Sequence, residues 1–300
     1  MQPESTMLSA PDTSFGEVYD RGYHHYDGQR LGRKQAFRAL TIYSMKRALG
    51  SKKSWTAKVT PTLMYIAAGL MVAIPLGIRA FIDDAGVVEY WEYFGAIYVI
   101  LTVFLASVAP EMLCNDRHEN VLPLYFARAI SRADYILAKV LATTLLTMTI
   151  TLLPTAIYWL GRQLLEDSPL SAMKDNLDDL ARVVVMCVVT SLFLASISLV
   201  ISSLTGRKSI AAAGIIVVLL VISFISYGVA ESGISADAAA YVLLANPLGL
   251  VEYFTYSLFD QVVESTNEVT RFATGVYGGV MMLVVLVCCG VMFWRYVPSD

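Results

Sequence analysis

One polar segment interrupts a sequence that is otherwise strongly apolar, and it holds residue types that could bind a partner protein. The segment covers residues 111–140 and reads EMLCNDRHENVLPLYFARAISRADYILAKV. Its eight charged side chains are Glu111, Asp116, Arg117, Glu119, Arg128, Arg132, Asp134 and Lys139. Its large central apolar side chains are Leu122, Leu124, Tyr125 and Phe126. Apolar side chains ringed by charges are typical of a protein-docking surface. The alternatives are a solvated loop and a segment that lies against lipid headgroups.

Motifs for catalysis, cofactor binding and metal binding are missing from the sequence. No phosphate loop of the form GxxxxGK(S/T) occurs, so the chain lacks that route to ATP. No ionisable residue stands in the middle of an apolar segment, which argues against a proton-driven carrier and against an intramembrane metalloenzyme. The four cysteines form no CxxC pair and are expected to be small buried hydrophobic residues. We therefore predict that the chain is not an enzyme and binds neither a cofactor nor a metal.

The composition is that of an integral membrane protein. Of the 300 residues, 56% are hydrophobic and only 16% are charged, and the mean hydropathy is +0.59. Soluble domains carry about a quarter charged residues. The net charge of −3 provides no basic field for nucleic acid.

Six apolar segments are long enough to cross a bilayer as helices, which takes about 20 residues each. They cover roughly residues 57–82, 94–109, 135–160, 181–204, 209–229 and 272–293. The sequence therefore predicts an all-α membrane domain over residues 57–297. The membrane interior is free of charge, which favours a hydrophobic or amphipathic cargo if the protein transports one.

The distribution of Lys and Arg predicts the orientation, because cytoplasmic loops are enriched in both. If the N-terminus is cytoplasmic, only five of the 22 Lys and Arg residues fall outside: Arg79, Arg162, Lys174, Arg182 and Arg271. Both termini are then cytoplasmic, in a multi-pass protein of the cytoplasmic membrane. Residues 1–32 have neither an apolar core nor a basic start, so we expect a polar cytoplasmic arm and not a secretory signal.

Residues 33–56 predict a basic amphipathic helix that lies in the membrane interface. Phe37, Leu40 and Tyr43 recur at helical spacing among basic residues that include Arg47. The alternative is a plain basic tether that fixes the topology.

Residues 230–271 form a long outer segment that contains the run ANPLGLVEYF. Asn246 is a good N-cap and Pro247 a good first helical residue, and Leu248 begins an apolar face. We expect one or two short helices that re-enter or line the outer interface. Asn246, Pro247 and Leu248 are candidates for an outer gate, and a passive lid is the alternative.

The polar segment resembles a known family. ENVLPLYFARAISRADYILAKVLATTLL is similar to the cytoplasmic segment between the second and third spans of ABC-2-type transporter permeases. The matching positions are Leu122, Leu124, Ile130, Ser131, Arg132, Tyr135 and Lys139. The sequence departs from the pattern at Asn120, Ala129 and Ala138. With the six spans and the helix before them, the resemblance covers about residues 33–295.

The resemblance implies a division of labour between subunits. The chain would be the permease of an ABC transporter, with a second permease copy as partner and an ABC ATPase subunit that binds ATP and Mg²⁺. Residues 111–134 would couple the permease to the ATPase subunit. The coupling residues would be Glu111, Asp116, Arg117, Glu119, Leu122, Leu124, Tyr125, Phe126 and Arg132. The alternatives are a scaffold or regulatory subunit that transports nothing and an ion-independent secondary carrier. The family suggests export and leaves the substrate open.

Overall fold

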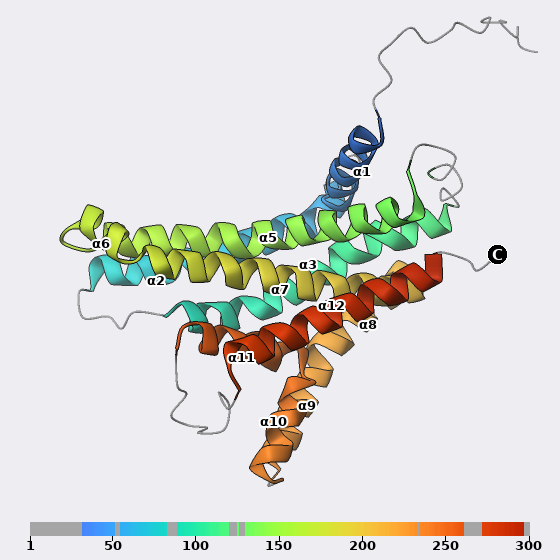
Figure 1. The fold of residues 1–300 in the computed structure, drawn as a ribbon. Helices are drawn as coiled ribbons and strands as arrows, with labels where there is room; N and C mark the ends of the chain where they lie inside the picture. Colours follow the sequence, from blue (N-terminus) through green and yellow to red (C-terminus); the bar gives the residue numbers. More distant parts are fainter. Residues whose placement is uncertain are drawn as a thin grey trace, which may run out of the picture. The chain divides into compact units, whose positions relative to one another are not determined.

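The computed structural model describes residues 32–51, 55–82, 89–119, 125, 130–232, 234–260 and 272–296. Two compact units divide the chain, Met1–Leu31 and Gly32–Asp300. The predicted N-terminal arm lies outside the described residues except for Gly32. Within the described ranges every regular element is a helix (Figure 1).

Six helices are long and apolar enough to cross a membrane, as predicted. They are α2 (Trp55–Phe81), α3 (Tyr90–His118), α5 (Arg132–Leu164), α7 (Leu177–Leu204), the continuous run of α8 (Lys208–Ile216), η1 (Val217–Val221) and α9 (Ile222–Glu231), and α12 (Thr274–Tyr296). The shorter helices are α1 (Arg33–Ala48), α6 (Pro169–Asp175), α10 (Ala236–Leu244) and α11 (Pro247–Leu258). The fold is therefore an all-α membrane fold with six spans.

The second span is longer than predicted. Its apolar pattern weakens after residue 109, yet α3 continues to His118 and carries Glu111, Asp116 and Arg117. The helix continues because these charged side chains have partners on neighbouring helices. Part of the predicted docking segment is thus the end of a membrane helix.

α3 lies at the centre of the bundle. In its most apolar stretch 72% of the residues are buried, against 17% for α2 and 22% for α12. α2, α5, α7 and α8 pack on α3, and α12 packs mainly on α7 (Figure 1). The outer helices expose large apolar side chains, as expected of surfaces that face lipid.

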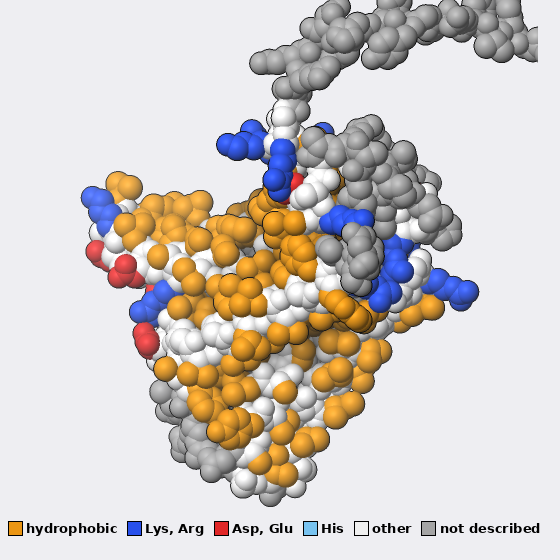
Figure 2. All heavy atoms as spheres, turned by 45° about the vertical axis from the view of Figure 1, so that its right-hand side comes forward, with side chains coloured by type: hydrophobic (Ala, Val, Ile, Leu, Met, Phe, Trp, Pro, Cys, Tyr) orange, Lys and Arg blue, Asp and Glu red, His pale blue; other side chains and the backbone are white. Residues whose placement is uncertain are grey.

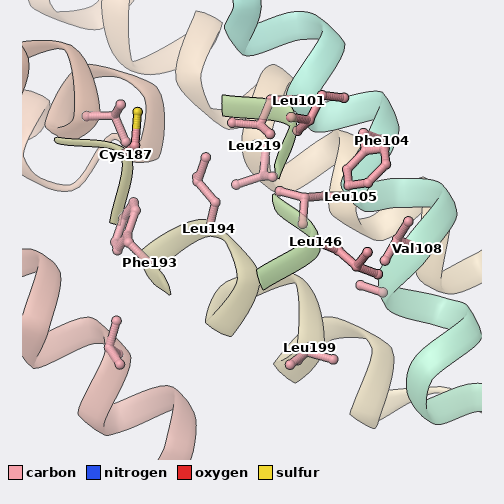
Figure 3. Packing of buried hydrophobic residues seen from close by; sticks show 14 of the residues in the cluster. Leu101, Phe104, Leu105, Val108, Leu146, Cys187, Phe193, Leu194, Leu199 and Leu219 are labelled. Atoms are coloured by element: carbon pink, nitrogen blue, oxygen red, sulfur yellow. The ribbon is translucent and has the colours of Figure 1, made fainter. Parts of the chain in front are cut away.

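The core is built on one stripe of α3. Leu101, Phe104, Leu105 and Val108 are fully buried and recur at the spacing of a single helical face (Figure 3). They pack in one cluster with Leu146 of α5, Leu194 and Leu199 of α7 and Leu219 of η1. Because lipid tails are as apolar as leucine, close packing and not water exclusion holds such helices together.

The charged side chains separate to the two ends of the bundle (Figure 2). We call the end with α1, the last turn of α3 and the first turn of α5 the α1 end. The opposite end, with α6, α11 and the first turn of α3, is the α11 end. Lys and Arg gather at the α1 end, and apolar side chains cover the surface between the two ends.

Candidate functional site

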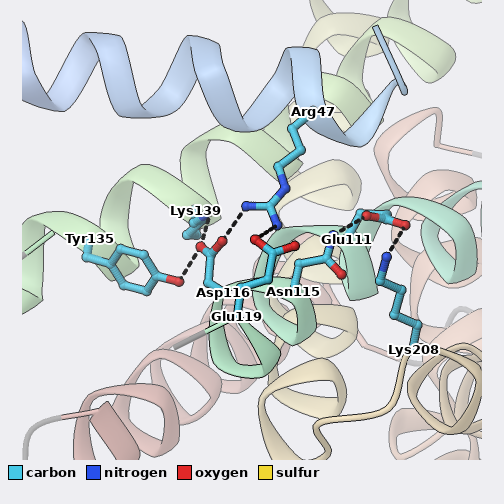
Figure 4. A network of polar contacts seen from close by, with 8 residues as sticks. All are labelled: Arg47, Glu111, Asn115, Asp116, Glu119, Tyr135, Lys139 and Lys208. Carbon is cyan, nitrogen blue, oxygen red and sulfur yellow. Dashed lines mark hydrogen bonds and ion pairs between the residues drawn. The ribbon is translucent and has the colours of Figure 1, made fainter. Parts of the chain in front are cut away.

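A buried carboxylate joins three helices at the α1 end (Figure 4). Asp116 of α3 has no exposed surface. Its Oδ1 accepts from Arg47 Nη1 of α1 at 2.6 Å, and its Oδ2 pairs with Lys139 Nζ of α5 at 2.8 Å. The hydroxyl of Tyr135, one turn before Lys139, donates to the same Oδ2 at 2.8 Å. Asp116 is therefore the point at which α1, α3 and α5 meet.

The charges around Asp116 balance. Glu119 Oε2 lies 3.2 Å from Arg47 Nη2, so two carboxylates face two cations. Burial opposes the charge on Arg47, but Asp116 and Glu119 outweigh it and raise the pKa of Arg47 above its ordinary value. Removing one partner of a buried pair typically costs about 3–5 kcal/mol, because the other charge is left uncompensated. The penalty applies to Asp116 and Lys139, which are buried, whereas the Glu119 side chain is 55% exposed.

A second ion pair holds α1 near its N-terminus. Arg33 contacts Asp134 through two hydrogen bonds, Nε to Oδ2 at 2.6 Å and Nη2 to Oδ1 at 2.7 Å. Asp134 also forms a capping box with Ser131, the N-cap of α5. The two arginines stand on one face of α1 because fourteen residues make about four turns, or ~21 Å. α1 is thus fastened to α5 by Arg33 and to α3 by Arg47.

The same end also ties α3 to α7 and α8. Glu111 Oε1 pairs with Lys208 Nζ of α8 at 2.9 Å, and Glu111 Oε2 accepts from Asn115 Nδ2 at 2.7 Å (Figure 4). Arg117 Nη1 donates to the carbonyl of Ser203 in the last turn of α7 at 2.6 Å. Cations suit the carbonyls at a helix C-terminus, which carry partial negative charge. The α1 end is a polar network that reaches four helices of the bundle and α1.

The structure brings several of the predicted coupling residues together and corrects the predicted exposure of one of them. Glu111, Asp116, Arg117 and Glu119 all belong to the network. Asp116, however, was predicted in a surface segment and is fully buried, because Lys139 and Arg47 enclose it.

Of the other predicted coupling residues, the structure describes Arg132 and Tyr125. Arg132 begins α5 and is half-buried. The ring of Tyr125 lies 5.7 Å from that of Tyr135, and burial raises the pKa of Tyr125 to about 12. Leu122, Leu124 and Phe126 lie outside the described residues.

α1 presents its side chains differently from the prediction. Leu40, Thr41, Ser44 and Ala48 are buried against the bundle and Phe37 is half-buried. Tyr43 is 44% exposed, so it is not buried against the bundle as Leu40 is. Arg47, a residue of the predicted interfacial helix, reaches into the bundle and pairs with Asp116.

Two open hollows flank α1, with Tyr43 and Ala39 on the rim of both. One has a volume of about 590 Å³ and is lined by Gln35, Ala39, Ile42, Tyr43, Lys46, Arg47, Ser51 and Glu119. The other measures about 330 Å³ and is lined by Ala36, Ala39, Leu40, Tyr43, Tyr125 and Ile130. Both give access to the helix that Arg47 fastens to α3.

A separate, uncharged network surrounds the predicted outer gate. Asn246 is fully buried, and its Oδ1 accepts from the backbone N–H groups of Leu248 at 2.9 Å and Gly249 at 3.1 Å. α11 begins at Pro247, as predicted. The Asn246 amide also donates to the carbonyl of Ser223 in α9 at 3.4 Å. The gate candidates thus lie at a joint between α11 and α9.

A π-helical turn lies next to this joint. η1 interrupts the regular hydrogen bonding of the fifth span, and such turns occur often at functional sites. The carbonyl of Leu219 accepts from Ser223 Oγ at 2.9 Å and from the hydroxyl of Tyr98 on α3 at 3.4 Å. Sequence reasoning missed η1, since VVLLV reads as an ordinary apolar helix.

Sequence reasoning also missed the partners of Asp116. The spacing of Tyr135 and Lys139 places both on one face of α5, and that was the available signal. Nothing local indicated which residue they would meet, because Arg47 lies 69 residues before Asp116.

The six spans define a polytopic α-helical membrane protein. The buried ionic network around Asp116 joins α1, α3 and α5 at one end of it. Residues 72–295 match the family described as ABC-2 family transporter protein, and the chain belongs to that family. No curated protein matches the chain. The chain is thus a membrane permease of an ABC transporter, a class whose members work with an ABC ATPase subunit. α1 lies before the matched residues, whereas Asp116 and Lys139 lie within them.

Proposed function

We propose that the chain is the permease subunit of an ABC exporter and that the α1 end faces the cytoplasm and receives the ATPase. The cationic α1 end supports this orientation, because Lys and Arg are enriched on the cytoplasmic side. Both termini are then cytoplasmic. In this proposal ATP and Mg²⁺ bind to the ATPase subunit, and catalysis takes place there.

The observation that carries the proposal is the network around Asp116. In the sequence, the residues after Glu119 connect the end of α3 to the start of α5. A force on that connection therefore acts on both helices. Asp116 joins the ends of α3 and α5 to each other and to α1. A movement imposed there by the ATPase reaches three helices together, and α3 extends it to the centre of the bundle.

The mechanism is a two-state population shift. ATP binding brings the ATPase subunits together and favours one arrangement of the coupling residues, and hydrolysis releases it. The α1 end changes its packing as a unit because its ion pairs are mutually dependent. Two permease copies form the pathway, and α1 contacts the lipid headgroups with its exposed side, on which Tyr43 and Ile42 lie.

The first test is purification of the tagged protein in mild detergent, with identification of the co-purifying proteins and an assay of ATP hydrolysis. A stoichiometric partner with a phosphate-binding loop that hydrolyses ATP supports the proposal. Its absence, also in native-lipid discs, would favour a scaffold or an ion-independent carrier.

The second test separates coupling from folding. Leu124→Asp places a charge among the predicted docking residues, and we expect it to leave insertion intact while it abolishes permease-stimulated ATP hydrolysis. Leu170→Asp is the matched control, because Leu170 is 78% exposed in α6 at the α11 end. Normal stimulation by a well-expressed Leu124→Asp protein would contradict the placement of the ATPase.

A further inference from the structure

A carboxylate at the α11 end has aromatic hydroxyl partners in place of a cation. Glu252 of α11 is half-buried. One oxygen accepts from the hydroxyl of Tyr227 on α9, and the other from the hydroxyl of Tyr256 at 3.2 Å. The hydroxyl of Tyr253 interacts with that of Tyr227. Two phenol hydroxyls from two helices therefore donate to one carboxylate, and a third phenol stands behind Tyr227.

Glu252 differs from other acids at the same end. Glu89 pairs with Arg162, Glu166 with Arg79 and Asp260 with Arg182. Among the described residues, no Lys, Arg or His pairs with Glu252. This half-buried anion thus has no counter-charge within the part of the chain that the structure describes, which is costly and calls for a cation.

A structural tie between α9 and α11 does not explain the charge. The amide oxygen of a glutamine would accept from a phenol at lower desolvation cost, because only the carboxylate carries a full charge. The negative charge of Glu252 is what distinguishes it from such an amide, and a cation would balance that charge. Aromatic faces beside a carboxylate are the usual composition of sites for ammonium groups.

We propose that Glu252, Tyr227 and Tyr256 bind the cationic group of an amphipathic organic cation on its way through the permease. This rests on the proposed transport function and names its substrate class. A metal ion fits less well, since the described residues hold no group of three His, Cys, Asp or Glu placed to bind one. The rings suit an organic cation with an apolar body, such as an amine or a quaternary ammonium or phosphonium ion.

The position of the three residues supports a place on a transport path. Leu248, Glu252 and Tyr256 recur every four residues and form one half-buried face of α11. The face lies one turn from the Asn246 cap that joins α11 to α9 beside the π-helical turn. α9, α10 and α11 pack on one another, so a ligand held by Tyr227 and Glu252 bridges two of them (Figure 1).

The test measures binding of radiolabelled tetraphenylphosphonium to the purified full-length permease in lipid nanodiscs, by equilibrium dialysis against empty nanodiscs. We expect saturable binding that Glu252→Gln weakens about 10-fold, as expected for loss of a partly desolvated charge contact. Glu252→Asp keeps the charge and should retain more affinity than Glu252→Gln. Tyr227→Phe and Tyr256→Phe keep the rings and should weaken binding only two- to threefold.

Matched controls separate this site from general electrostatics. Glu166→Gln removes a carboxylate at the same end that pairs with Arg79, and it should leave binding unchanged. Tetraphenylborate, an anion of the same shape, should not compete. The proposal is overturned if the wild-type protein shows only the partition of empty nanodiscs, or if a folded Glu252→Gln protein binds as tightly as wild type.

The assay contains no ATPase, so it is independent of the proposed coupling. Glu252-dependent binding without a detectable ATPase partner would leave the site standing and remove the exporter proposal. Stimulated ATP hydrolysis without saturable binding would support the exporter proposal and remove the cation site.

Discussion

Two buried networks, one near each end of the bundle, hold helices together with different chemistry. At the α1 end, Asp116 joins three helices through charged partners, Arg47 and Lys139. Near the α11 end, Asn246, Ser223 and the carbonyl of Leu219 join α11, α9 and η1 through uncharged groups. Both networks are buried, so burial alone does not decide which chemistry is used.

The difference lies in what each network must do. In an apolar medium, uncharged side chains can bond backbone groups that lack a regular helical partner, at little desolvation cost. This suits the π-helical turn and the N-terminus of α11. Buried ion pairs contribute little net stability but are strongly penalised when one partner leaves. The Asp116 network at the α1 end is therefore a linkage between helices, and the Asn246 network near the α11 end satisfies backbone groups.

The largest effect is expected from Asp116→Ala. The substitution leaves Lys139 buried without its anion and leaves Arg47 with Glu119 alone, and it should lower the free energy of unfolding by about 3–5 kcal/mol. Thermal unfolding in detergent, followed by circular dichroism, measures the loss.

The double variant Asp116→Leu with Lys139→Met sharpens the comparison. It removes both charges and keeps the volume, so we expect it to be more stable than Asp116→Ala. It should nevertheless fail to couple the ATPase if the linkage transmits movement. A double variant as unstable as the single one would show that shape, and not uncompensated charge, makes Asp116 important.

A smaller effect is expected from Asn246→Ala. The change removes the cap from two backbone N–H groups of α11, and loss of a cap typically costs about 1 kcal/mol, with up to ~2 kcal/mol at the upper end. Asn246→Ser keeps a capping oxygen and should recover most of the loss. Unfolding in denaturing detergent compares the two variants. A loss as large as that of Asp116→Ala would break the distinction between the two networks.

The sequence predicts the fold well where the signal is a long apolar run. Each span rests on about 20 successive residues, and a single misread position cannot hide such a segment. The N-cap at Asn246 was also readable, because Asn followed by Pro is a local signal.

The candidate site was less predictable because its contacts are not local. The charges of Asp116 and Glu111 were read as a surface loop, since charged residues usually end a span. Only the packing of α1 and α5 against α3 shows that these charges have partners. Arg47 was selected as an interfacial residue and owes its importance to a carboxylate far along the chain.

The smallest effect is expected from Arg33→Ala. Arg33 and Asp134 form a second ion pair between α1 and α5, but the Arg33 side chain is 67% exposed. Exposed pairs are screened by salt, and the screening length shortens to about 3 Å at 1 M. We expect a small decrease in the unfolding temperature at low salt that vanishes at high salt, with the neighbouring exposed Lys34→Ala as control. The decrease caused by Asp116→Ala should persist at high salt, because buried pairs are screened much less. If both decreases vanished at high salt, Asp116 would be accessible to ions. The distinction between the buried pairs of Asp116 and the exposed Arg33–Asp134 pair would then be wrong.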